Sequence, residues 1–121
     1  DPLQTRLKAN LKADIKNAMA KGLPVSITIE EVLEKFNEQQ GLCYYTGLPM
    51  TCSSEMRGRG NWDYSSVSID RLIPSKGYTK ENVVLCSFWA NTAKLDLDYE
   101  EMVKRCKEVV RHYENNRSKQ V

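Results

Sequence analysis

The sequence has no long apolar run, no paired cysteines and no strong excess of either charge. No segment approaches the ~20 apolar residues of a membrane-spanning helix, and no signal-peptide pattern opens the chain. The four cysteines form no C-x-x-C pair, so we expect reduced thiols and an intracellular protein rather than a disulfide framework. A length of 121 residues fits one globular domain with a modest core.

The charge is only mildly basic, but it is unevenly distributed. A net charge of +2 permits nucleic-acid binding without requiring it. Residues 1–22 carry five Lys or Arg against two Asp, and Arg57 and Arg59 lie in a polar, glycine-bearing loop over 53–63. A further basic stripe, which is either a solvated face or a phosphate-contacting one, consists of Lys8, Lys12 and Lys16.

Three segments show the apolar repeat of an amphipathic helix. The first ends at Gly22, the second begins with a capping box at Thr28 and Glu31, and the third follows Asp98 and should fray after Asn115. The side chains expected to face the core are Leu3, Leu7, Leu11, Ile15, Ala18 and Met19 in the first helix, Val32, Leu33 and Phe36 in the second, and Met102, Val103, Cys106, Val109, Val110 and Tyr113 in the third.

The centre of the chain has a different pattern. Residues 43–50 predict a short strand and a turn, residues 64–73 alternate as a strand does, and residues 83–87 form a short apolar strand. A short helix over 88–97 follows. The expected fold class is therefore α+β, with a strand–loop–strand–helix unit flanked by N- and C-terminal helices.

Polar residues occupy defined positions in this central unit. Asp70 lies at the end of the first strand, Asn82 lies in the loop, and Asn91 lies on the helix with eight residues between the two asparagines. A strand end and a helix face can hold oxygen ligands on one side of a hard cation, which leaves positions open for water and phosphate. The pattern thus favours a small metal-dependent phosphate site.

In this region the sequence resembles the HNH (ββα-metal) endonuclease family, and in particular its phage and mobile-element branch. The resemblance covers about residues 41–96. It is carried by the ordered series Cys43-Tyr44-Tyr45-Thr46-Gly47, Ser68-Ile69-Asp70-Arg71-Leu72, Lys76-Gly77-Tyr78, Asn82-Val83 and Asn91-Thr92-Ala93-Lys94.

The resemblance implies a single HNH-like nuclease domain over 1–121. Its N-terminal helices would lie in 1–40, its small ββα-metal core in 41–96, and its C-terminal helix and tail in 97–121. Such a protein would act in the cytoplasm of a host cell without membrane association, and it could belong to a larger phage or mobile-element assembly.

The family's roles can be transferred to matching positions. Asp70 and Asn91 would be the ligands of a Mg²⁺ or Mn²⁺ ion, and Asn82 would tie the loop together by hydrogen bonds. Lys94 lies three residues after Asn91 on the same helical face and would reach a phosphate oxygen.

Arg71 stands where most of the family has the histidine that acts as general base. A guanidinium stays protonated, so Arg71 would instead bind the scissile phosphate bidentately and stabilise the charge that develops there. The attacking water would then be deprotonated by Tyr78, Tyr64 or Glu81, or it would attack as a metal-bound hydroxide that needs no side-chain base. His112, the only histidine, is expected on the surface.

A structural zinc is not expected, although many relatives hold one with two C-x-x-C pairs. Cys43 keeps one position of the first pair, and Thr46 fills the other. The positions of the second pair are Ser87 and Ala90. We expect the flanking helices to supply the packing that zinc supplies elsewhere.

The resemblance implies a metal-dependent DNA endonuclease that hydrolyses phosphodiester bonds and, with one site per chain, nicks double-stranded DNA. Contacts to the DNA backbone would come from Arg57, Arg59, Arg71, Lys76 and Lys94. Two alternatives stay open: a catalytically weakened or inactive DNA-binding module of the same fold, and a small α+β interaction domain whose motif matches arise by chance. RNA or a particular nucleic-acid structure also remains open as the substrate.

Overall fold

The computed structural model describes residues 1–52 and 63–119, and within them the chain adopts an α+β fold as predicted. Its elements are α1 (Pro2–Ala20), α2 (Ile29–Glu38), β1 (Val67–Arg71), the 3-10 turn η1 (Pro74–Lys76), β2 (Val83–Ser87), α3 (Phe88–Lys94) and α4 (Tyr99–Lys119). Arg57 and Arg59 fall outside the described residues. Within the described ranges no helix combines the length and the apolar character needed to cross a membrane.

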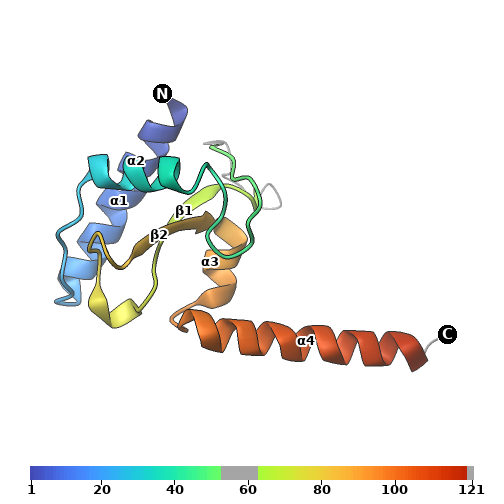
Figure 1. Ribbon diagram of the computed structural model, residues 1–121. Coiled ribbons are helices and arrows are strands. Elements are labelled where there is room, and N and C mark those ends of the chain that lie inside the picture. The colour runs from blue at the N-terminus through green and yellow to red at the C-terminus, as the bar shows by residue number, and fades with distance from the viewer. Residues whose placement is uncertain (53–62, 120–121) are drawn as a thin grey trace.

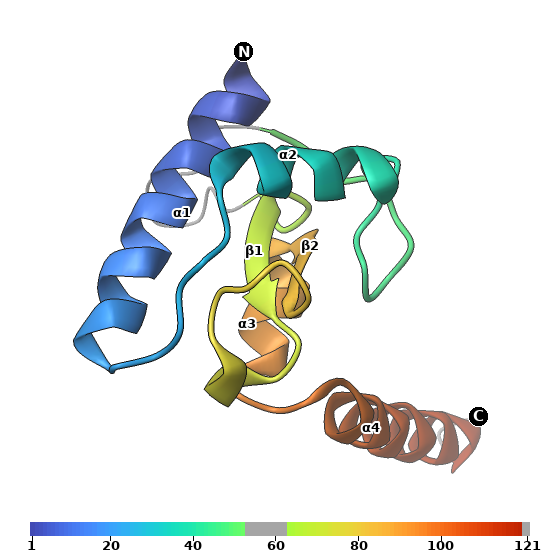
Figure 2. The same cartoon turned by 60° about the vertical axis from the view of Figure 1, so that its left-hand side comes forward.

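The centre of the molecule is a hairpin of two antiparallel strands (Figure 1). Its register pairs Val67 with Ser87 and Arg71 with Val83. α1 packs against β1 and α2 packs against β2, whereas α3 contacts both strands. The second view shows α1 and α3 at different sides of the hairpin (Figure 2). This ββα unit lies within the range that the sequence predicts for it.

The alternation of side chains along β1 decides which helix each of them meets. Ser68 and Asp70 point toward α3, where their side chains contact Asn91 and Lys94. Arg71 points the other way, toward α1, and lines a small cavity there with residues of that helix. Adjacent residues of the strand therefore belong to opposite faces of the hairpin.

The N-terminal helices form where the sequence predicts them. Asp1 caps α1 by accepting a hydrogen bond from the Leu3 amide at 3.0 Å. At α2 the predicted capping box is present, with reciprocal hydrogen bonds between Thr28 and Glu31. The two helices cover the hairpin with buried side chains that include Leu7, Leu11, Ala18 and Val32, whereas Met19, predicted to face the core, is exposed.

The predicted packing of the C-terminal helix is wrong. α4 extends away from the hairpin (Figures 1 and 2), and of its predicted core residues Met102 alone is buried. Cys106 is exposed, and the exposed fractions of Val109 and Tyr113 are 69% and 60%. The cause is the connection at Leu95, whose positive φ of 53° ends α3 and redirects the chain. An amphipathic repeat predicts that a helix has an apolar face, but it does not predict what covers that face.

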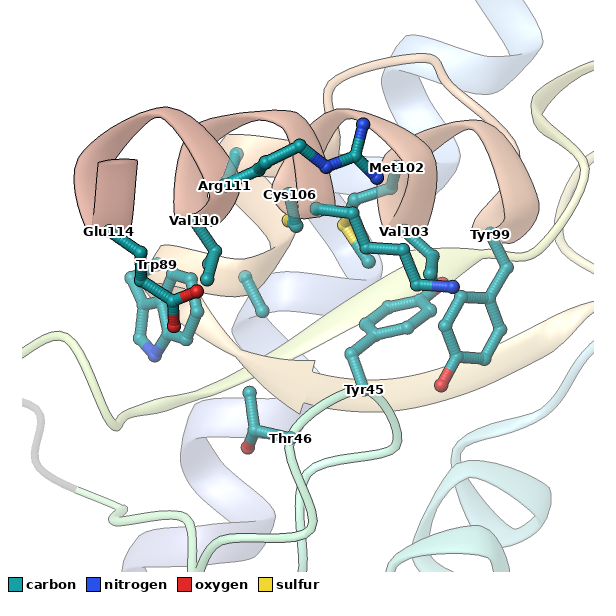
Figure 3. Close-up of a pocket in the computed structure, with 13 residues that line it drawn as sticks. Tyr45, Thr46, Trp89, Tyr99, Met102, Val103, Cys106, Val110, Arg111 and Glu114 are labelled. Atoms are coloured by element: carbon teal, nitrogen blue, oxygen red, sulfur yellow. The ribbon is translucent and has the colours of Figure 1, made fainter. Parts of the chain in front are cut away.

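An apolar groove results between α4, α3 and the 43–50 turn (Figure 3). Its volume is about 490 Å³, and its walls include Trp89, Tyr99, Met102, Val103 and Val110. The helix also continues through Asn115 to Lys119 rather than fraying, which corrects the predicted end.

Three other predictions of secondary structure need correction. Residues 43–50 contain no strand; they form a turn closed by the Gly47 amide on the Cys43 carbonyl at 2.9 Å, with an isolated bridge between Leu42 and Pro49. The strand predicted over 64–73 is confined to β1, and the helix predicted over 88–97 ends at Lys94. The predicted strand over 83–87 is confirmed as β2.

Gly77 is expected to tolerate no side chain, because a Cβ there would lie 2.1 Å from the Pro24 carbonyl oxygen and its φ is +71°. Gly77→Ala should cost about 3 kcal/mol of unfolding free energy, measured by urea denaturation. Gly47 has the same φ but open space around it, so Gly47→Ala should cost only about 1 kcal/mol. Equal losses in the two variants would show that the close approach to Pro24 is unimportant.

Candidate functional site

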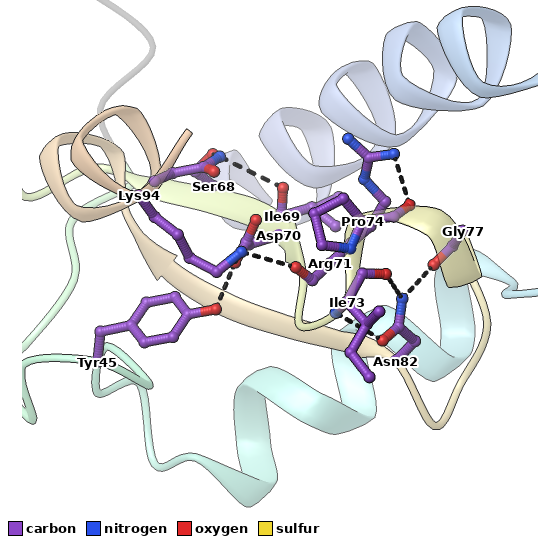
Figure 4. A network of polar contacts seen from close by, with 11 residues as sticks. Tyr45, Ser68, Ile69, Asp70, Arg71, Ile73, Pro74, Gly77, Asn82 and Lys94 are labelled. Carbon is purple, nitrogen blue, oxygen red and sulfur yellow. Dashed lines mark hydrogen bonds and ion pairs between the residues drawn. The ribbon is translucent and has the colours of Figure 1, made fainter. Parts of the chain in front are cut away.

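Asp70 lies at the centre of a buried polar network on the α3 face of the hairpin (Figure 4). Its Oδ2 atom is 3.2 Å from the ammonium of Lys94 and also accepts a hydrogen bond from the Tyr45 hydroxyl. The Lys94 ammonium donates a second hydrogen bond, of 2.9 Å, to the Arg71 carbonyl. One carboxylate oxygen of Asp70 is therefore fully engaged by the protein.

Lys94 does not occupy the position that the resemblance implied. Its side chain is fully buried, so no part of it is available to contact a phosphate from outside. The reason is the short length of α3, which brings its last turn over the end of β1 and points the lysine inward to Asp70. We therefore assign Lys94 to the support of Asp70 rather than to DNA contact.

Tyr45 belongs to the network, although no role for it is predicted from the sequence. Burial and its hydrogen bond to Asp70 raise the pKa of the Tyr45 hydroxyl, which keeps it a hydrogen-bond donor. Its ring makes edge-on contacts with Tyr44 and Tyr99, at centroid distances of 5.3 and 4.9 Å. These contacts connect the 43–50 turn and the first turn of α4 to the Asp70 carboxylate.

Asn91 lies on the same face as Asp70. Its side-chain amide donates hydrogen bonds to the Ser68 hydroxyl at 2.6 Å and to the Ile69 carbonyl at 3.4 Å. These bonds orient the amide group with its nitrogen toward β1. Among the described residues, neither Asn91 Oδ1 nor Asp70 Oδ1 takes part in a hydrogen bond or an ion pair. Two oxygen atoms on one face thus remain open to a further ligand.

This donor set fits a hydrated divalent cation. Carboxylate and amide oxygens are ligands that Mg²⁺ and Mn²⁺ prefer. In residues 1–52 and 63–119 no cluster of three or more His, Cys, Asp or Glu side chains could form a closed metal cage. A cation held by Asp70 and Asn91 would accordingly keep positions for water and for phosphate oxygens, as a catalytic Mg²⁺ does.

Asn82 has the loop-tying role expected of it, and this prediction is confirmed. It is buried, and its amide donates hydrogen bonds to the carbonyls of Ile73 and Gly77 at 2.9 and 2.8 Å. Its carbonyl accepts from the Ile73 amide at 3.0 Å. The loop between the strands is therefore fixed at both of its ends, which holds the end of β1 in place.

The structure does not bring the Arg71 side chain to the carboxylate of Asp70 (Figure 4). Its guanidinium donates a hydrogen bond to the Pro74 carbonyl at 3.0 Å and lies over the ring of Tyr78, 5.2 Å from the centroid. The separation follows from strand alternation, since Asp70 and Arg71 are neighbours in β1.

The side chains predicted as candidate bases differ in burial. Tyr78 is buried, and burial raises its pKa to about 12, so it keeps its proton near neutral pH. Tyr64 and Glu81 are exposed. His112 is on the surface as predicted, and Lys76 is exposed.

Asp14, on α1, is a polar residue near the site that the sequence reading missed. It lines a small cavity with Arg71 and Tyr78, and burial raises the pKa of its carboxyl to about 6 against the attraction of Arg71. A signal was present in the sequence: Asp14 lies three residues after Leu11 and four before Ala18, on the apolar face of the helix.

Asp14→Asn is expected to stabilise the protein at pH 7. Because the native pKa lies above the ordinary value of 3.8, the charged carboxylate destabilises the native state above about pH 6, and the penalty disappears as the pH falls to 4. Urea denaturation at pH 7 and pH 4 should show the advantage at pH 7 alone. The exposed Asp96→Asn variant is the control, and a destabilised Asp14→Asn at pH 7 would contradict this account.

Of the four positions that the resemblance associates with zinc, Cys43, Thr46 and Ser87 are connected by hydrogen bonds. Cys43 Sγ accepts from the Ser87 amide at 3.2 Å and lies 3.6 Å from the Ser87 hydroxyl. Burial raises the pKa of the Cys43 thiol, but hydrogen bonds with Thr46 and Ser87 outweigh it and leave that pKa below its ordinary value. All four cysteines are unpaired.

The comparisons with known proteins bear on the fold. No protein-family model and no curated protein sequence matches the chain. A solved structure of PacI, described as a rare-cutting HNH restriction endonuclease with a mechanism of DNA perturbation, superposes with a TM-score of 0.59 over 92% of this chain and 81% of that one. The sequences are 18% identical in this comparison, so the likeness concerns the fold alone. The chain has an HNH-type nuclease fold, as the sequence resemblance implied.

Proposed function

We propose that the chain is a metal-dependent DNA endonuclease that hydrolyses phosphodiester bonds. The observation that carries the proposal is the pair of open oxygens, Asp70 Oδ1 and Asn91 Oδ1, on the α3 face of a ββα unit. A similar fold in an HNH restriction endonuclease supports this proposal. The proposed products are a 5′-phosphate and a 3′-hydroxyl, and one site per chain would nick one strand.

Each residue of the site has a proposed part in this reaction. When bound, a divalent cation would stabilise negative charge on the phosphate and on the leaving oxygen. Asp70 and Asn91 would hold it, while Tyr45 would fix the orientation of the Asp70 carboxylate. Asn82 would keep the end of β1 in place for the incoming DNA strand.

Basic side chains near the strand end would bind the DNA backbone. Lys76, on η1, is exposed and would contribute salt-dependent contacts. Arg71 is partly exposed on the α1 side of the hairpin, and we propose that it binds a phosphate bidentately there. Arg57 and Arg59 remain proposed contacts from the sequence alone.

Arg71→Ala is expected to reduce the single-turnover cleavage rate about tenfold to a hundredfold, through loss of a charge-assisted phosphate contact. Binding of Mn²⁺ should be unchanged, because the guanidinium lies on the face opposite Asp70 Oδ2 and donates to Pro74. Arg71→Lys should recover little, since it keeps the charge without the bidentate geometry. Full activity in Arg71→Ala would disprove the phosphate contact.

A second candidate function is a DNA-binding module of the same fold with weak or no catalysis. Two observations favour it: Lys94 already neutralises Asp70, and Arg71 faces away from that carboxylate. The test is a supercoiled-plasmid assay at low salt with Mg²⁺, Mn²⁺ or EDTA, run beside a gel-shift assay. Metal-dependent conversion to open circles supports the endonuclease, and a gel shift without conversion supports the binding module.

A further inference from the structure

Lys94 is the largest fully buried side chain of the described residues, and it carries a charge. A lysine is rarely buried completely unless its ammonium is paired. Here the ammonium lies between Asp70 Oδ2, at 3.2 Å, and the Arg71 carbonyl, at 2.9 Å, with the ring of Tyr45 6.0 Å away. The protein therefore supplies its own cation to the carboxylate that we propose as a metal ligand.

We propose that Lys94 is the positioning residue that sets metal affinity at Asp70, acting as an internal counter-ion that keeps Oδ2 occupied and leaves Oδ1 alone for the metal. This inference rests on the proposed function, since it concerns the same cation site. It assigns to a buried lysine of α3 a control over how tightly the divalent ion is held.

The contacts around Asp70 support the proposal that Lys94 fixes the orientation of the metal-binding carboxylate. Two donors, the Lys94 ammonium and the Tyr45 hydroxyl, meet on the same carboxylate oxygen. With Oδ2 engaged twice, the carboxylate cannot rotate freely, and bidentate binding of a cation through both oxygens is blocked. The second hydrogen bond of Lys94, to the Arg71 carbonyl, holds the ammonium in this place.

The charges support the proposal that Lys94 also lowers metal affinity electrostatically. Asp70 and Lys94 together are neutral, so an incoming divalent cation meets a neutral pair instead of a lone carboxylate. The ammonium also repels a cation bound to the neighbouring oxygen, and this repulsion is strong where water is largely excluded. Removal of the Lys94 charge should therefore tighten metal binding by a factor on the order of ten or more.

The experiment measures Mn²⁺ affinity directly, by electron paramagnetic resonance of the free ion in the absence of DNA. The proteins are the wild type, Lys94→Gln, Asp70→Asn and, as a matched control, the exposed Lys80→Gln. Glutamine keeps a hydrogen-bond donor and removes the charge. We expect Lys94→Gln to bind Mn²⁺ at least about tenfold more tightly than the wild type, Lys80→Gln to match the wild type, and Asp70→Asn to lose the site.

The outcomes separate this inference from the proposed function. If Asp70→Asn loses Mn²⁺ while Lys94→Gln binds it as the wild type does, Lys94 is merely structural and the inference is overturned, but the metal site stands. If the wild type binds no Mn²⁺, or Asp70→Asn binds it equally well, the proposed site itself fails, and the inference fails with it.

If Lys94→Gln does not fold in EDTA, the reason is that the buried Asp70 carboxylate has lost its ammonium partner. In that case its refolding is followed by circular dichroism during titration with Mn²⁺. Recovery of the helical signal by Mn²⁺ supports the inference, since the metal then replaces the missing counter-ion. Failure to refold at any Mn²⁺ concentration overturns it.

Discussion

The Asp70→Asn variant is expected to lose metal-dependent DNA cleavage by a factor of about a thousand or more. Substitution of residues that merely support a metal ligand costs roughly 10–100-fold, so removal of the ligand should cost more. The change is nearly isosteric and converts a carboxylate oxygen into a weaker, neutral donor. The measurement is the rate of conversion of supercoiled plasmid to open circles, with the exposed Asp96→Asn variant as control.

Asp70→Asn also leaves the buried Lys94 ammonium without its carboxylate, so lost stability must be separated from lost chemistry. The double variant Asp70→Asn/Lys94→Gln removes both charges and should regain much of the stability. It should remain as inactive as Asp70→Asn. If either variant cleaves within about tenfold of the wild-type rate, Asp70 is not the ligand that this account requires.

Lys94→Met is expected to destabilise the metal-free protein by about 3–5 kcal/mol, because it leaves a buried carboxylate without a counter-ion. Methionine has a similar length and keeps the packing of the lysine stem, so the loss should come from the ammonium. The ammonium makes two contacts, with Asp70 Oδ2 and with the Arg71 carbonyl, and both would be lost. The free energy of unfolding is measured by urea denaturation in EDTA.

The matched control for Lys94→Met is Lys80→Met, at an exposed position, which should change stability by no more than about 0.5 kcal/mol. A double-mutant cycle with Asp70→Asn isolates the pair from other effects of each change. If Lys94→Met lowers the free energy of unfolding by less than about 1 kcal/mol, the buried ion pair contributes no more than a typical surface pair, and its structural importance is refuted.

Much of the central unit could be predicted because its signals are local. The β2 strand is predicted directly by a run of apolar residues. Asn82 follows a glycine turn, and its side chain hydrogen-bonds to residues of the same short loop. The order of the motif also predicts that Asp70 and Asn91 share a face. These features depend on few long-range contacts.

The remaining features depend on packing between distant segments. Tyr45 comes from a turn 25 residues before Asp70, and no local pattern connects the two. Lys94 was read as a surface cation because its inward direction depends on where α3 ends. The direction of the Arg71 side chain, by contrast, follows from a local rule. Strand alternation places it on the face opposite Asp70, so this feature was predictable from the sequence.

The central claim is that Asp70 and Asn91 hold a divalent cation, and the most direct test is a crystal grown with Mn²⁺ and measured for anomalous scattering. The account predicts an anomalous peak bonded to Asp70 Oδ1 and Asn91 Oδ1 at roughly 2.0–2.3 Å, with the remaining positions filled by water, and with Lys94 still on Oδ2. A peak elsewhere, or none at saturating Mn²⁺, would contradict the account.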